Sequence, residues 1–120
     1  MPTIRFTTEL ASISTCRYFV REQMAGCSDP VKDVAALLTS ELVANAIIEG
    51  QAGGEFDLSL GGGALRLEVR YSNRREPIPR SHGIEFLLGE EIIESLSDEW
   101  GVEQTRSDKR VWARIDHVSC

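Results

Sequence analysis

Two polar residues interrupt the apolar middle of the longest helical pattern in this chain. Glu41 and Asn45 lie four residues apart within the string ELVANA, and a helix places residues at this spacing side by side on one face. A carboxylate can accept a proton from a hydroxyl or a water, and a carboxamide oxygen suits a hard cation such as Mg²⁺. The spacing therefore indicates either a site for water, a metal ion or a ligand, or two solvated groups at the edge of an apolar stripe.

A long helix is expected to position this pair. The string SDP at residues 28–30 is a start signal, because Ser and Asp cap helices and Pro is favoured in the first turn. Apolar residues then recur at three- and four-residue steps as far as Ala46, and Gly50 is expected to end the helix. Another helix precedes it in the sequence. It is predicted to begin within residues 12–15 and to end at about residue 25, because Gly26 follows.

Alternation of apolar and polar residues indicates the strands. Strands are predicted over residues 3–7, 56–60, 65–71, 99–104 and 110–116. The glycines at 61–63 lie between two strands, which favours a hairpin turn over a phosphate loop. A loop at 72–86, of a length typical of lids and binding loops, precedes a third helix at 87–96 whose predicted apolar face contains Leu88, Ile92 and Leu96.

The predicted order of elements, β-α-α-β-β-α-β-β, is that of an α+β fold. We expect a two-layer α/β sandwich in which a mixed sheet carries three helices on one face. The 120 residues, 42% hydrophobic and 27% charged, are expected to form one domain over residues 1–120. Trp100 and Trp112 are interpreted as packing residues of that domain.

Composition also narrows the classes of function. The net charge of −6 argues against nucleic-acid binding, and the apolar stretches are shorter than the ~20 residues of a membrane helix. Three cysteines without a CxxC pair, and a start that lacks a signal-peptide core, favour a reduced, cytoplasmic protein. His82 and His117 have no second ligand at metal spacing.

A resemblance to a known family adds to these predictions. The string ALLTSELVANAIIEG resembles the conserved helix motif of the GHKL (Bergerat-fold) ATPases, and the ordered set ELVANA, LEVR, DEWGV and VW is similar to the small ATP-binding proteins related to anti-sigma-factor serine kinases. The resemblance covers nearly the whole chain. It implies that Glu41 is a catalytic general base and that Asn45 binds the cofactor by coordinating Mg²⁺ against the phosphates of ATP.

The same resemblance implies partners. In relatives these are sigma factors and STAS-type antagonists whose Ser or Thr is phosphorylated, and relatives often form homodimers. No nucleic acid and no membrane is expected among the partners of this chain. Four arginines flank the loop at 72–86 and form either a cationic rim for phosphate or an acidic partner, or solvated charges. They are Arg70, Arg74, Arg75 and Arg80.

The chain departs from the family where adenine would bind. Tyr71 stands in place of the Asp that accepts a hydrogen bond from adenine. Asn73, two positions on, or Ser72 is the candidate for a substitute contact. Arg110 stands in place of a Thr on the closing strand. The His that often follows the helix motif is Glu49 here. These changes predict the loss of contacts that hold a purine.

The glycine turn that approaches phosphate in relatives is also reduced. It reads LLGE, in which Gly89 retains the second glycine as a cofactor-binding candidate. Glu90 and Glu91 at a helix N-terminus would repel phosphate. We therefore expect an anti-sigma-type regulatory protein with weakened or lost ATP binding and little or no enzyme activity. The alternatives are an active Mg²⁺-ATP-dependent serine/threonine kinase of a STAS-type antagonist, and an ATP-gated binding switch.

Overall fold

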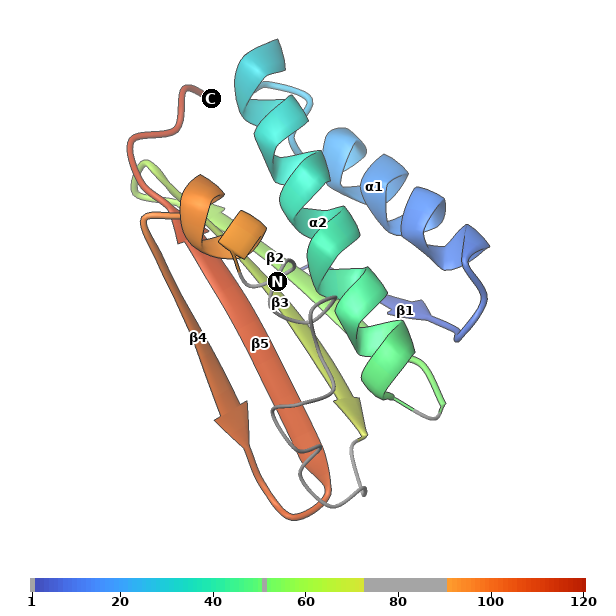
Figure 1. Ribbon diagram of the computed structural model, residues 1–120. Helices are drawn as coiled ribbons and strands as arrows, with labels where there is room; N and C mark the ends of the chain where they lie inside the picture. Colours follow the sequence, from blue (N-terminus) through green and yellow to red (C-terminus); the bar gives the residue numbers. More distant parts are fainter. Residues whose placement is uncertain (1, 51, 73–90) are drawn as a thin grey trace.

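The computed structural model describes residues 2–50, 52–72 and 91–120 as an α+β sandwich (Figure 1). Its elements are β1 (Thr3–Phe6), α1 (Ala11–Gln23), α2 (Asp29–Glu49), β2 (Gly54–Gly61), β3 (Ala64–Ser72), β4 (Glu99–Gln104) and β5 (Asp108–Ile115). Residues 91–96 are helical, which confirms the described part of the third predicted helix. Among the described residues, no helix has the length and apolar character needed to cross a bilayer.

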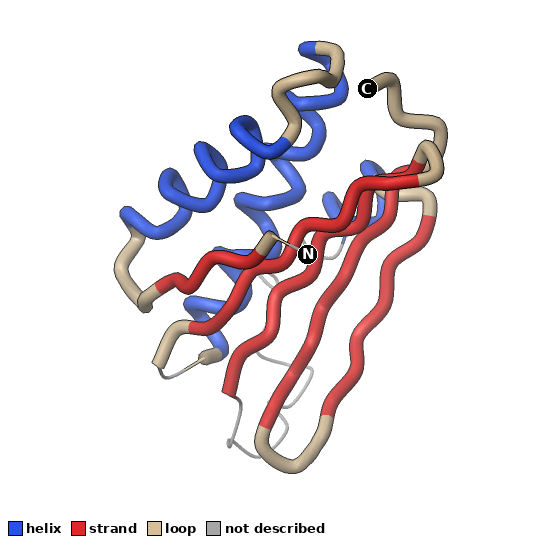
Figure 2. The backbone as a smooth tube through the Cα atoms, turned by 180° about the vertical axis from the view of Figure 1, so that it is seen from behind, coloured by secondary structure: helices blue, strands red, loops and turns tan. Residues whose placement is uncertain are grey.

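The five strands form one sheet in the order β1-β2-β3-β5-β4. All four pairings are antiparallel, so the prediction of a mixed sheet is wrong in this respect. The connection from β3 to β4 contains a helix, and these two strands run in the same direction. They form no parallel pair because β5 lies between them and is antiparallel to both. The helices lie on one face of the sheet, and the opposite face is open (Figure 2).

The core fills the space between the sheet and the helices. Alternate residues of β3 are buried, which confirms the predicted alternation. The fully buried side chains include Leu38, Leu42, Phe56, Leu58, Leu65, Leu67 and Val69. In the helical segment 91–96 the most deeply buried side chain is Ile93, whereas Ile92, which was predicted to face the core, is half-buried.

The ends of α2 follow the sequence closely. The helix begins at Asp29 with Pro30 in its first turn and ends at Glu49. Gly50 is extended there, at φ −79°, and donates its N–H to Ala46 O at 2.7 Å. A Cβ at Gly50 would lie 2.6 Å from Ala46 O and 3.3 Å from Cδ2 of Tyr71. Glycine is therefore needed at this position for close packing.

The β2–β3 connection is a two-residue hairpin, as predicted. Gly62 and Gly63 have positive φ angles of 61° and 77°, the backbone that such a turn requires. The first helix ends at Gln23, two residues before its predicted end, and it has no side-chain cap. Ser12, in the first turn of α1, accepts the N–H of Thr7 at 3.0 Å and so connects the helix to the end of β1.

A disulfide joins Cys27 to Cys120 across 93 residues of sequence. This pairing corrects the expectation of reduced cysteines, which rested on their odd number and on the absence of a CxxC pair. Only the fold reveals the pairing, because it returns the C-terminus to the α1–α2 connection. Cys16 is buried in α1 and carries a free thiol.

Candidate functional site

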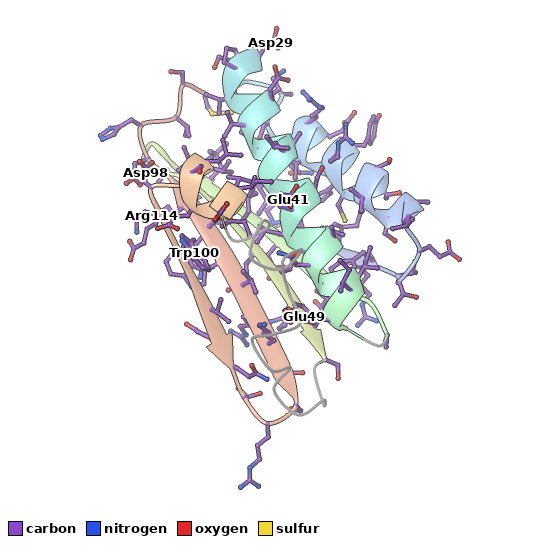
Figure 3. All side chains as sticks on the ribbon, in the orientation of Figure 1. Asp29, Glu41, Glu49, Asp98, Trp100 and Arg114 are labelled. Atoms are coloured by element: carbon purple, nitrogen blue, oxygen red, sulfur yellow. A yellow bond between two sulfur atoms is a disulfide. The ribbon has the colours of Figure 1, made fainter. Side chains whose placement is uncertain are left out.

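Glu41 and Asn45 lie on α2 beside its buried face, and both are half-buried. Figure 3 shows Glu41 near the middle of the helix and Glu49 two turns further, where α2 ends. Leu42, Val43 and Ala46 anchor this part of α2 in the core, which fixes the orientation of the polar pair. The structure therefore supports the prediction that the pair lies side by side, at the margin of the core.

The Glu41 and Asn45 side chains have no hydrogen bond or ion pair in the described part of the chain. Burial raises the pKa of the Glu41 carboxyl above its ordinary value, because the charged form loses solvation. A higher pKa makes the carboxylate a stronger base. Among the described residues, one carboxylate and one carboxamide thus lie side by side on α2 without a hydrogen-bond partner.

A second polar cluster lies at the C-terminal end of the same helix. Tyr71 donates its hydroxyl to Oε2 of Glu49 at 2.6 Å. Lys109 donates its ammonium to both carboxylate oxygens, at 3.1 Å and 2.7 Å. The exposed fractions are 5% for Glu49, 2% for Tyr71 and 8% for Lys109. These three residues, the buried triad, satisfy each other's charges and hydrogen bonds inside the protein.

Three elements bring the triad together. Glu49 is the last residue of α2, and Tyr71 and Lys109 are register partners on β3 and β5. Burial and the hydrogen bond to Glu49 both raise the pKa of Tyr71 above its ordinary range. Tyr71 therefore remains a neutral hydrogen-bond donor at any physiological pH.

Arg110 was predicted to lie where adenine binds in relatives, but the structure places it elsewhere. Lys109, Val111 and Ala113 face the helices and are buried, whereas Arg110 is exposed. Side chains on a strand alternate between faces, so Arg110 lies on the open face of the sheet. The residue that β5 contributes to the interior here is Lys109.

Sequence reasoning identified Tyr71 and Glu49 as departures from the family pattern but missed Lys109. The available signal was the alternation of β5. Two-residue steps backwards from Ala113 through Val111 place position 109 on the buried face. The comparison with the family motif placed Arg110 at the position of a Thr that supports the adenine site. Arg110 instead lies on the face of β5 that points away from the helices.

Two glycines pack against the Tyr71 side chain. A Cβ at Gly50 would lie 3.3 Å from the ring, and a Cβ at Gly54 would lie 3.0 Å from Cβ of Tyr71 and 2.3 Å from Arg70 O. Contacts this short leave no room for side chains at either position. The triad therefore occupies a closely packed part of the molecule.

Several other predicted residues have different settings. Arg70 forms an ion pair with Glu55 at 3.0 Å on the open face of the sheet, so it belongs to no rim on the helical side. Trp100 packs against the core as predicted, whereas the Trp112 ring lies on the open face with the Arg66 guanidinium 5.0 Å from its centroid.

Other predicted positions lie outside the described residues, and so does the stretch 73–90 that contains them. These are Asn73, Gly89, Arg74, Arg75, Arg80 and His82. Within the described ranges, no three His, Cys, Asp or Glu side chains are grouped as a metal site. A Mg²⁺ ion at Asn45 would therefore depend on ligand and water oxygens for most of its coordination.

Comparison with known proteins identifies the fold. The sequence matches no protein-family model and no curated protein. Among solved structures, the chain is similar to the histidine kinase AdeS of Acinetobacter baumannii, with a TM-score of 0.57 and 11% sequence identity. The match covers 98% of this chain and 68% of the other. The chain therefore has a fold like that of a histidine kinase domain.

Proposed function

We propose that this chain is a cytoplasmic regulatory protein of the anti-sigma-factor type. On this proposal it has a GHKL ATPase fold, binds a protein partner, and has weakened or lost its affinity for ATP. The observation that carries the proposal is the buried triad of Glu49, Tyr71 and Lys109. The likeness of fold to a histidine kinase supports the scaffold, and the ELVANA string supports the branch of the family.

The triad opposes purine binding for an energetic reason. The resemblance to the family assigns the adenine contact to the position of Tyr71, and here a salt bridge and a tyrosine fill that region. Breaking a buried ion pair by removing one partner costs about 3–5 kcal/mol. A ligand that had to open the triad would bind more weakly by a factor of about a hundred to several thousand. The residues present do not fit a purine.

The proposed partner is a sigma factor or a STAS-type antagonist, by analogy with relatives of the same branch. The net charge of −6 is consistent with a protein partner rather than nucleic acid. Loss of nucleotide affinity does not prevent such binding, since a protein interface depends on surface shape and contacts. A second copy of the chain is the other proposed partner.

One observation favours a second candidate, the Mg²⁺-ATP-dependent serine/threonine kinase. Glu41 has a raised pKa and no hydrogen bond or ion pair within the described residues. In a kinase it would accept the proton of the attacking hydroxyl, and Asn45 would hold Mg²⁺. An ATP-gated binding switch would use the same two residues without the transfer step.

Calorimetric titration with ATP and Mg²⁺ tests the proposal. We expect no saturable binding in the micromolar range, either for the unmodified protein or for Asn45→Ala. Ser40→Ala is a matched control, because Ser40 lies on the same helix and its hydroxyl bonds, among the described residues, only to Ala36 O at 3.1 Å. Micromolar binding that Asn45→Ala abolishes and Ser40→Ala preserves would contradict the proposal. Labelled ATP with STAS-type proteins would then distinguish a kinase from a switch.

A further inference from the structure

The C-terminal segment at residues 116–120 lies outside the sheet and returns to the helices. Figure 1 shows the C-terminus beside the start of α2, and Figure 2 shows the same from behind. The segment has no helix or strand of its own. Its end is covalently bound, since Cys120 forms the disulfide with Cys27 in the α1–α2 connection.

Noncovalent contacts of the segment accompany the disulfide. Asp116 donates its N–H to Oδ2 of Asp98 at 2.6 Å, and its carboxylate forms an ion pair with Arg114 at 3.0 Å. Ser28 donates its N–H to Ser119 O at 2.9 Å, and Val118 donates its N–H to Gly63 O at 2.9 Å. The Val118 side chain packs against the core. His117 has a φ of 56°, in the left-handed region that non-glycine residues rarely adopt. This backbone persists only where the surrounding structure holds it. Here Asp116 is held on one side by Asp98 and Arg114, and residues 118–120 are held on the other side by two hydrogen bonds and the disulfide.

The segment begins at an apolar hollow. Pro30, Val31 and Val34 from the first turns of α2 line this hollow together with Ile115, the last residue of β5. The disulfide and the Ser28 contact precede these turns by only a few residues. The position of the C-terminal segment is therefore linked to the start of α2 and to the edge of the hollow.

The three cysteines differ in accessibility. Cys120 is exposed and Cys27 is 8% exposed, whereas Cys16 is inaccessible. Burial raises the pKa of the Cys16 thiol to about 11, so its reactive thiolate is scarce at neutral pH. An exposed disulfide is open to attack by a thiolate, whereas a buried thiol is not. The Cys27–Cys120 disulfide is therefore accessible to a reductant through Cys120, whereas the Cys16 thiol is not accessible.

We propose that the Cys27–Cys120 disulfide is a redox switch that holds residues 117–120 when oxidised and releases them when reduced, while Asp116 keeps its contacts with Asp98 and Arg114. A thiolate of a small dithiol attacks Sγ of Cys120, the S–S bond breaks, and Cys27 leaves as a thiolate that takes up a proton. The second thiol of the reagent then closes its own disulfide and frees Cys120 as a thiol. Two electrons pass from the dithiol to the protein, and oxidation reverses the step.

Release changes the surface at one end of the molecule. The N–H of Ser28 loses Ser119 O, the N–H of Val118 loses Gly63 O, and the backbone of His117 leaves the left-handed region. The Val118 side chain then becomes accessible beside the hollow at Pro30 and Ile115. The backbone pairing of the sheet and the buried triad keep their contacts, because residues 117–120 take part in neither.

Amide hydrogen exchange followed by NMR tests the switch on the full chain. We expect reduction with dithiothreitol to accelerate exchange at the amides of Ser28 and Val118 at least tenfold. The amide of Gly50, at the other end of α2, should keep its protection. Cys120→Ser should show the reduced pattern without reductant. Cys16→Ser is the control and should respond to dithiothreitol as the unmodified protein does.

Three results would overturn the proposal. The first is unchanged exchange at Ser28 and Val118 after complete reduction, as measured by thiol alkylation and mass spectrometry. The second is an equal loss of protection at Gly50, which would mean that reduction unfolds the whole molecule. The third is a disulfide between two copies in place of the pairing within one chain, detected as a crosslinked dimer on a non-reducing gel.

Discussion

Glu41 and Glu49 are two turns apart on one helix but have opposite electrostatic settings. Glu49 accepts hydrogen bonds from a neutral and a charged donor, so its negative charge is compensated. Glu41 has no such partner in the described residues, and burial raises the pKa of its carboxyl. A partly buried carboxylate without a partner destabilises the folded state, which is typical of residues kept for binding or catalysis.

Replacing Glu41 by Gln should stabilise the protein at pH 7. Because the folded-state pKa of Glu41 is raised, the unfolded state loses its proton first, and stability falls as the pH rises above about 4.5. Glu41→Gln removes this loss and should raise the free energy of unfolding by a few tenths of a kcal/mol, since the side chain is partly screened by solvent. The gain should vanish at pH 3. Urea unfolding at both pH values measures it, with Glu94→Gln on an exposed carboxylate as control.

Tyr71→Phe should change stability in a pH-dependent way. At pH 7 the loss of a hydrogen bond to a charged group should lower the free energy of unfolding by about 1.5–3 kcal/mol. The folded-state pKa of Tyr71 is raised, so its contribution is complete below the ordinary pKa of about 10 and is lost as the pH rises further. The difference from the unmodified protein should narrow above pH 10. A constant difference up to pH 11 in denaturant unfolding would contradict this.

At the scale of elements, hydrophobic periodicity predicted most of the strands and both long helices. Alternation in β3 and the SDP and Gly50 signals of α2 are local, so the sequence contains them directly. The partners of Tyr71 were not predictable in this way. Glu49 and Lys109 come from other elements, and their proximity depends on the register between β3 and β5, which no local pattern specifies.

Two neighbouring substitutions on β5 test this register. Lys109→Met leaves Glu49 buried with one donor fewer and should lower the free energy of unfolding by about 3–5 kcal/mol. Arg110→Met alters an exposed side chain and should change it by less than about 0.5 kcal/mol. Thermal and denaturant unfolding of both variants give the comparison. A larger loss of stability for Arg110→Met than for Lys109→Met would mean that β5 presents the opposite face to the helices.

At the scale of the whole molecule, the two-layer arrangement was predictable and the order of the strands in the sheet was not. The alternation of helical and strand patterns implies one covered sheet. The pattern cannot show that β5 lies between β3 and β4, since both orders bury the same residues. The Cys27–Cys120 disulfide was missed for a similar reason. Its two residues are 93 positions apart, and only the completed sheet directs the C-terminus back to α2.

Closure of so long a loop should contribute strongly to the stability of the whole chain. The chain-entropy description of a disulfide gives about 4–5 kcal/mol for a loop of this length. Reduction, or Cys120→Ser, should therefore lower the midpoint of urea unfolding substantially. Cys16→Ser keeps the disulfide, so reduction should lower its midpoint by as much as it lowers that of the unmodified protein. Equilibrium unfolding with and without dithiothreitol measures the difference. Identical midpoints would show that the disulfide does not constrain the unfolded chain. A large shift in the midpoint, together with retained protection of the Gly50 amide from exchange, fits a molecule that stays folded after its C-terminal segment is released.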